Sequence, residues 1–211
     1  LAQNGADLTI CSRTPEAIEA TAQEIRSATG APVHAIACDI TTEEGRAKAL
    51  APFDSKLDIL VNNAGIQFRK PMLELDTADW RRVIEINLTA AFVVGREAAK
   101  RMAKRGRGKV INIGSLTSEL ARATVAPYTV AKGGIKMLTK AMAAEWGEMG
   151  IQSNAIGPGY MVTDMNEALI KNPEFDAWVK GRTPMRRWGL PEELAGTCIY
   201  LASDASNYVS G

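Results

Sequence analysis

Short apolar runs alternate with longer amphipathic segments along all 211 residues of this sequence. Strand-like runs cover residues 5–13, 31–40, 56–65, 108–115 and 151–159, and helical periodicity covers 15–30, 43–52, 80–105, 127–150, 163–182 and 191–201. Strands separated by helices of this kind form parallel βαβ units, with helices on both faces of the sheet. The pattern therefore predicts an α/β protein with a doubly wound parallel sheet.

Composition favours a single domain that binds a small molecule. With 46% hydrophobic residues the chain can bury one sizeable core, and 25 basic against 24 acidic residues give a net charge of +1. This balance provides no strong field for nucleic acid or for a membrane surface, and the sequence has no apolar run long enough to span a bilayer. We therefore expect neither of these partners.

The cysteines and the single histidine argue against a metal site. Cys11, Cys38 and Cys198 lack metal-binding spacing, and an odd number of cysteines cannot all pair within one chain, which favours a reducing, cytoplasmic compartment. His34 lies in a short apolar run, where we interpret it as structural. Neither a histidine-based triad nor a zinc site is expected.

Small and polar residues follow each predicted strand. In open parallel sheets, ligands bind beyond the carboxyl ends of the strands. Any one of these residues could serve an ordinary turn, but all five groups together indicate a binding site at one edge of the sheet. The groups are Ser12-Arg13-Thr14, Asp39, Asn62-Asn63-Ala64-Gly65, Gly114-Ser115 and Gly157-Pro158-Gly159.

Tyr128 and Lys132 lie four residues apart, on one face of the predicted helix. Such pairs are common, so the spacing alone leaves open whether this pair is catalytic. The wider sequence holds, in order, NNAG at 62–65, Asn87, Ser115 thirteen residues before Tyr128, and PGYMVT at 158–163. With these motifs the chain resembles the short-chain dehydrogenase/reductase family over essentially its whole length. The resemblance implies a Rossmann-like fold and an NAD(P)-dependent enzyme that acts on CH–OH groups.

The resemblance also implies roles for four residues. Tyr128 would be the acid/base, and lowering the pKa of a tyrosine from about 10 to near 7 takes roughly 4 kcal/mol. We expect Lys132 to supply much of this lowering and the positive nicotinamide ring the rest. Ser115 would hydrogen-bond the substrate oxygen, and Asn87 would hold a water that links Lys132 to solvent. The alternative for Asn87 is a polar side chain merely tolerated in a helix.

Residues at the strand ends predict the cofactor. Ser12-Arg13 stands where an acidic residue would bind the ribose of NAD, and an arginine can pair with a 2′-phosphate, so we expect NADP, with NAD as the alternative. An ordinary solvent-facing arginine is the other explanation for Arg13, and a helix N-cap is the other explanation for Thr163. By resemblance, the remaining cofactor contacts are Asp39 at the adenine, Asn63, Ala64 and Gly65 at the strand-end turn, and Tyr128, Lys132, Pro158, Gly159 and Thr163 near the nicotinamide.

The glycine-rich turn Gly-x-x-x-Gly-x-Gly that holds the pyrophosphate in this family does not occur in these 211 residues. We therefore expect residues 1–211 to form a single short-chain dehydrogenase/reductase domain truncated at both ends, without the first and last strands of the sheet. The intact protein would carry about 30–40 further residues before Leu1, one βα unit, and a further stretch after Gly211.

Three segments predict the substrate: 66–72, 116–126 and 164–189. They resemble the branch of the family that interconverts D-gluconate and 5-keto-D-gluconate. Arg69 and Arg122 would bind the carboxylate and Glu119 the hydroxyls, with Ser115 and Tyr128 at the reacting oxygen. A 3-oxoacyl-thioester reductase, another keto-sugar reductase and a catalytically silent nucleotide-sensing protein are the alternatives. By resemblance, the helices within 80–105 and 127–149 would pack against symmetry mates in a homotetramer or homodimer.

Overall fold

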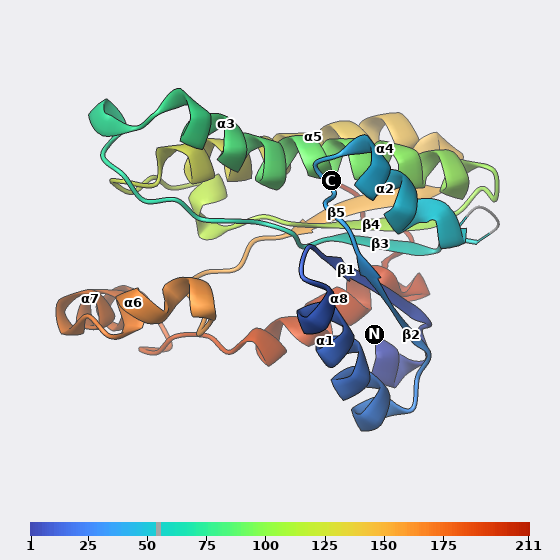
Figure 1. Cartoon of the computed structure of the whole chain (residues 1–211), viewed down its shortest axis with the longest axis horizontal. Coiled ribbons are helices and arrows are strands. Elements are labelled where there is room, and N and C mark those ends of the chain that lie inside the picture. Colours follow the sequence, from blue (N-terminus) through green and yellow to red (C-terminus); the bar gives the residue numbers. More distant parts are fainter. Residues whose placement is uncertain (54–55) are drawn as a thin grey trace.

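The computed structural model describes residues 1–53 and 56–211. Its strands and helices alternate in the predicted order (Figure 1). The strands are β1 (Leu8–Ser12), β2 (Val33–Ala37), β3 (Ile59–Asn62), β4 (Gly108–Ile113) and β5 (Ile151–Ile156). The helices are α1 (Pro15–Thr29), α2 (Glu43–Leu50), α3 (Thr77–Ile84), α4 (Ala90–Ala103), α5 (Ala126–Trp146), α6 (Glu167–Ile170), α7 (Pro173–Arg182) and α8 (Ala195–Ala202).

All strand pairs are parallel, as the βαβ pattern predicts. β1 pairs with β2, and β4 lies between β3 and β5 in a second sheet. Within the described residues no ladder of backbone hydrogen bonds joins the two sheets. Because parallel strands present their carboxyl ends at the same edge, Asn62, Ile113 and Ile156 end side by side.

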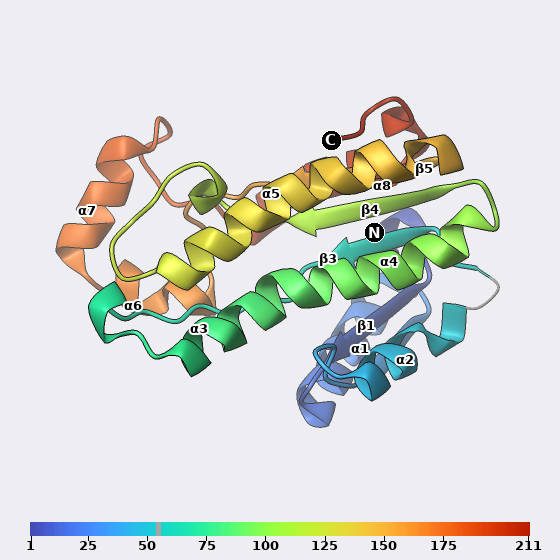
Figure 2. The same ribbon diagram turned by 90° about the horizontal axis from the view of Figure 1, so that it is seen from above.

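Helices cover both faces of the β3–β4–β5 sheet because neighbouring strand residues point to opposite sides. Val110 packs in a core with Ala98 and Met102 of α4 and Met142 of α5, and Figure 2 shows these two helices running along the sheet. Ile111, the next residue of β4, packs with Leu201 of α8 on the other face. The prediction of a doubly wound α/β fold is confirmed.

Two predicted helices differ in the structure. The helix expected over 80–105 begins at Thr77 and contains a π-helical segment, Glu85–Thr89, between α3 and α4. The helix expected over 163–182 is broken into α6 and α7 because Pro173 starts a new helix, and the Asn172 side chain caps it by accepting from the Phe175 amide at 3.0 Å. No helix in the described part of the chain is long and apolar enough to cross a membrane.

Candidate active site

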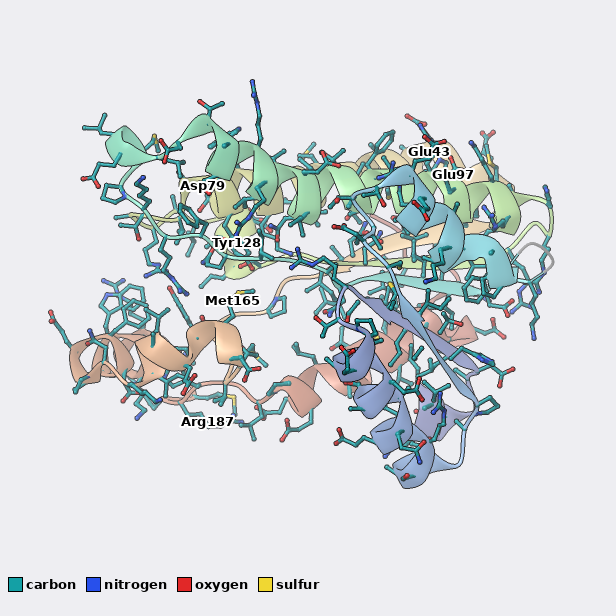
Figure 3. All side chains as sticks on the ribbon, in the orientation of Figure 1. Glu43, Asp79, Glu97, Tyr128, Met165 and Arg187 are labelled. Atoms are coloured by element: carbon teal, nitrogen blue, oxygen red, sulfur yellow. The ribbon has the colours of Figure 1, made fainter. Side chains whose placement is uncertain are left out.

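One pocket lies where the carboxyl ends of β4 and β5 meet the start of α5. Tyr128 of α5 and Met165 of the segment after β5 approach the same region from two sides (Figure 3). The Leu116 amide donates to the Pro158 carbonyl at 2.8 Å and ties the two strand ends together. The pocket is lined by Gln67, Ser115, Leu116, Thr117, Arg122, Val125, Tyr128, Gly159, Tyr160, Met165 and Asn166.

Ser115, Tyr128 and Lys132 come together as the spacing predicted. Tyr128 and Ser115 line the same pocket, and the Ser115 side chain lowers the pKa of Tyr128. The Lys132 ammonium lies 5.6 Å from the centroid of the Tyr128 ring and donates to the Ile113 carbonyl at the end of β4, at 2.6 Å. Lys132 is only 4% exposed, so α5 holds a charged group inside the domain.

Burial governs the protonation of this group of residues. It raises the pKa of Tyr128, while the hydrogen bond from Ser115 and the charge of Arg69 oppose that change. Burial lowers the pKa of Lys132 to about 8. In the protein alone, Ser115 and Arg69 are the groups that favour the phenolate. Our expectation that Lys132 supplies much of the lowering at Tyr128 stays a prediction for the protein with its cofactor bound. Because burial raises its pKa, the phenol stays protonated at neutral pH in the protein alone.

Asn87 lies in the π-helical segment and is 1% exposed. Its Oδ1 accepts from the Ile66 amide at 3.2 Å, and its Nδ2 donates to the carbonyls of Ile66 and Val83 at 3.0 and 2.9 Å. Asn87 thus fastens the segment after β3 to the helix. A Cβ at Gly65 would lie 2.7 Å from Asn87 Oδ1 and 3.8 Å from Lys132 Nζ. Only glycine therefore fits at this position.

Ser12, Arg13 and Asp39 gather at the carboxyl ends of β1 and β2. The Cys38 amide donates to the Ser12 carbonyl at 2.8 Å, which places these two strand ends together. Hydrogen bonds from Thr41 lower the pKa of Asp39 most, and the charge of Arg13 adds to this effect. Arg13 is exposed, so its guanidinium is free to meet an anion at this edge.

Beyond β3 and β5, the expected cofactor contacts lie in open segments. Asn63 and Ala64 are exposed after β3, and Gly159 has open space where a Cβ would be. Thr163 precedes a short 3-10 helix, Asp164–Asn166, but its side chain makes no capping hydrogen bond. The capping explanation for Thr163 therefore lacks its expected bond.

Arg69 and Arg122 approach each other beside the pocket. Arg69 Nη2 donates to the Met165 carbonyl at 3.2 Å, and the Arg122 guanidinium lies 5.1 Å from the centroid of the Phe175 ring. Burial lowers the pKa of Arg69, and the charge of Arg122 lowers it further. Within residues 1–53 and 56–211, neither arginine forms an ion pair with a carboxylate.

The structure places Glu119 away from the hydroxyl-binding position that we expected. Glu119 is exposed, forms an ion pair with Lys136 of α5, and does not line the pocket. A second hollow of about 400 Å³ lies against α3, lined by Trp80, Arg81, Arg82, Ile84 and Glu85, and holds none of the predicted site residues.

Sequence reasoning did not single out seven of the lining residues: Gln67, Leu116, Thr117, Val125, Tyr160, Met165 and Asn166. They lie within or beside the segments expected to choose the substrate, but loop sequence does not say which side chains turn inward. Tyr160 belongs to an aromatic cluster in which its ring meets those of Phe175, Trp178 and Trp188 edge-on at 5.5–5.9 Å. This cluster forms a rigid wall on the β5 side of the pocket.

The chain is similar to known proteins over its whole length. A family model described as Enoyl-(Acyl carrier protein) reductase matches residues 1–211. Gluconate 5-dehydrogenase of Gluconobacter oxydans is 42% identical over 214 residues, covering 100% of this chain and 83% of the relative.

Two solved structures are also similar. One, from Agrobacterium tumefaciens, is provisionally described as a gluconate dehydrogenase; it has 64% identity and a TM-score of 0.96, covering 99% of this chain and 83% of that one. The other is a gluconate 5-dehydrogenase from Burkholderia cenocepacia in complex with NADP and tartrate, with 41% identity, a TM-score of 0.94 and the same coverage. From the matched family model, these relatives and the fold, the chain belongs to the short-chain dehydrogenase/reductase family of oxidoreductases.

Proposed function

We propose that the protein is an NADP-dependent oxidoreductase that interconverts a sugar-acid alcohol and its ketone, with D-gluconate and 5-keto-D-gluconate as the pair. One observation carries this proposal: Ser115 and Tyr128 line one pocket beside Arg69 and Arg122, and neither arginine forms an ion pair with a carboxylate among the described residues. Reduction of a ketone requires a group that donates a proton to its oxygen, and binding of a carboxylate is favoured by positively charged side chains. The names of the similar gluconate 5-dehydrogenases support the same substrate class.

Tyr128 would move the proton in either direction. A bound nicotinamide would supply or accept the hydride. During reduction the Tyr128 phenol would donate its proton to the substrate oxygen, and Ser115 would hydrogen-bond the same oxygen as negative charge develops on it. Because burial raises the pKa of Tyr128, the phenol is in the form that reduction needs at neutral pH. Lys132 and Asn87, whose side chains both lie close to Gly65, would carry a proton from solvent to replace the one that Tyr128 donates.

The strand-end residues fit NADP. Arg13 is exposed beside Asp39 and would pair with the 2′-phosphate, with Ser12 next to it and Asp39 at the adenine. Asn63, Ala64 and the close-packed Gly65 would border the cofactor after β3. At the nicotinamide end, Pro158, Gly159 and Thr163 would complete the contacts with Tyr128 and Lys132.

We also propose that residues 1–211 form a single domain that assembles as a cytoplasmic homotetramer or homodimer. Phe92 of α4 is 41% exposed, and Val130 and Met137 of α5 are 50% and 61% exposed, so both helices present apolar side chains to a second copy. The three free cysteines suit a reducing compartment.

Arginine variants test the carboxylate assignment. D-glucitol differs from D-gluconate in carrying a neutral hydroxymethyl group in place of the carboxylate. Arg122→Met should raise the KM for D-gluconate about tenfold or more and change that for D-glucitol by less than about twofold. Arg182→Met is the matched control, because Arg182 also lies over an aromatic ring, that of Trp178 at 4.8 Å, but does not line the pocket. Equal effects of Arg122→Met on both substrates would contradict the carboxylate contact.

A second candidate is a 3-oxoacyl-thioester reductase, which would reduce the ketone of an acyl thioester. The matched family model, described as Enoyl-(Acyl carrier protein) reductase, supports an acyl thioester as the kind of substrate but names the reduction of a C=C bond. NADPH oxidation with 5-keto-D-gluconate, other keto-sugar acids and an acetoacetyl thioester separates the candidates. Turnover of the thioester without turnover of the keto acids would replace the sugar-acid proposal.

A further inference from the structure

Gln67 lines the same pocket and carries a polar atom that the chain leaves unused. Its Oε1 is buried and accepts no hydrogen bond from the described residues. Two other buried hydroxyl oxygens without partners, on Thr129 and Ser153, belong to residues that do not line the pocket. Gln67 is therefore a pocket-lining residue whose side-chain oxygen lacks a hydrogen-bond donor among the described residues.

An unsatisfied buried acceptor destabilises the protein, because it has lost water without gaining a protein donor. The terminal torsion of a glutamine is soft, so the amide can turn toward a donor that enters the pocket. Arg122 lines the same pocket and Arg69 lies near it, so when the amide turns toward the pocket the positive charges favour its carbonyl oxygen over its NH₂ group. A ligand that offers a hydroxyl donor at this position would remove this destabilisation.

We propose that Gln67 is a specificity-determining residue that accepts a hydrogen bond from a hydroxyl of the substrate other than the reacting one. The inference rests on the proposed function for the carboxylate and the ketone, and it assigns a residue that would recognise the further hydroxyls of a polyhydroxy acid. A simple keto acid would leave Gln67 Oε1 unpaired, and sites built to pair a hydroxyl reject analogues that lack it. Gln67 thus takes the role that we had expected of Glu119, whose carboxylate pairs with Lys136 instead.

Binding of two acids to the full-length protein with NADPH tests the proposal without turnover. D-Gluconate and hexanoate share six carbons and a carboxylate, but only D-gluconate carries hydroxyls. Calorimetry should show that Gln67→Leu weakens D-gluconate binding about tenfold, or 1.4 kcal/mol, and leaves hexanoate binding within about twofold. Gln23→Leu, at an exposed glutamine of α1, should change neither affinity.

Folding of the variant is checked by its unfolding midpoint, which should not fall because leucine removes the unpaired oxygen. Gln67→Met, of closely similar length, serves as a second variant and should give the same loss. Unchanged D-gluconate affinity in both variants, or an equal loss for hexanoate, would overturn the role of Gln67.

The kinetic assay separates this inference from the proposed function. A wild-type protein that reduces no 5-keto-D-gluconate, yet binds D-gluconate in a manner that depends on Gln67, would refute the proposed reaction and retain the inference. Normal turnover of 5-keto-D-gluconate, with D-gluconate affinity unchanged by Gln67→Leu, would retain the proposed reaction and refute the inference. Absence of D-gluconate binding to the wild type would refute both.

Discussion

Replacing Lys132 by methionine measures the free energy that burial of the Lys132 ammonium costs the folded protein. Burial lowers the pKa of Lys132 from 10.5 to about 8. This lowering of about 2.5 units corresponds to roughly 3 kcal/mol by which the fold disfavours the ammonium. The variant also loses the hydrogen bond to the Ile113 carbonyl, which costs about 1 kcal/mol. Lys132→Met should therefore be more stable than the wild type at neutral pH, although inactive.

The pH dependence isolates the electrostatic part of this difference. Below about pH 8 both folded and unfolded wild type carry the proton on Lys132, so the cost of burial is fully present. Between about pH 8 and 10.5 the folded state binds fewer protons than the unfolded state, so the wild type gains stability as pH rises and the variant does not. The stability advantage of Lys132→Met should shrink by about 2 kcal/mol between about pH 7 and pH 9.5.

Urea unfolding of the full-length protein without cofactor, followed by tryptophan fluorescence, gives both free energies at each pH. Lys140→Met, at an exposed lysine of the same helix, is the matched control and should show no comparable closing of the gap. A constant difference between wild type and Lys132→Met across this range would refute the argument that burial makes the ammonium costly.

Three further substitutions test neighbouring parts of the site. Asn87→Ala removes three buried hydrogen bonds and should lower the free energy of unfolding by roughly 2–4 kcal/mol; a loss below about 1 kcal/mol in urea unfolding would contradict the fastening role. Gly65→Ala would place its Cβ 2.7 Å from Asn87 Oδ1 and should destabilise by about 1–3 kcal/mol, whereas unchanged unfolding would show that the amide can move. Arg13→Glu should raise the KM for NADPH about tenfold or more and spare NADH, and equal effects on both cofactors would contradict a 2′-phosphate contact.

The fold and the reacting residues follow from local sequence because parallel topology is restrictive. Alternating strand and helix periods predict βαβ units, and these units bring every strand end to one edge. Ser115 follows β4 directly, and Tyr128 and Lys132 share a face of α5, so their meeting needs no knowledge of distant contacts. The same reasoning places Ser12 and Asp39 together.

Long-range contacts explain what local sequence could not give. The π-helical segment at Glu85–Thr89 has ordinary helical periodicity, yet Asn87 within it bonds to Ile66, 21 residues earlier. Glu119 was expected at the substrate because of its segment, but Lys136, 17 residues later on α5, pairs with it. Gln67 lines the pocket, and its buried Oε1 has no hydrogen-bond partner among residues 1–53 and 56–211, a combination that its sequence position does not indicate. Contacts between residues distant in the sequence depend on how the elements pack, and the periodicity of the sequence does not predict them.

The central claim is that Tyr128 moves a proton to or from a sugar acid during NADP-dependent oxidoreduction. Its most direct test is NADPH oxidation by the full-length protein with 5-keto-D-gluconate, compared between the wild type and Tyr128→Phe. We expect steady turnover by the wild type, a loss of about 1,000-fold in kcat for the variant, and NADPH affinities of the two proteins that agree within about twofold. NADPH binding without turnover in the wild type, with identical behaviour of Tyr128→Phe, would refute proton transfer by Tyr128 and favour a nucleotide-sensing protein.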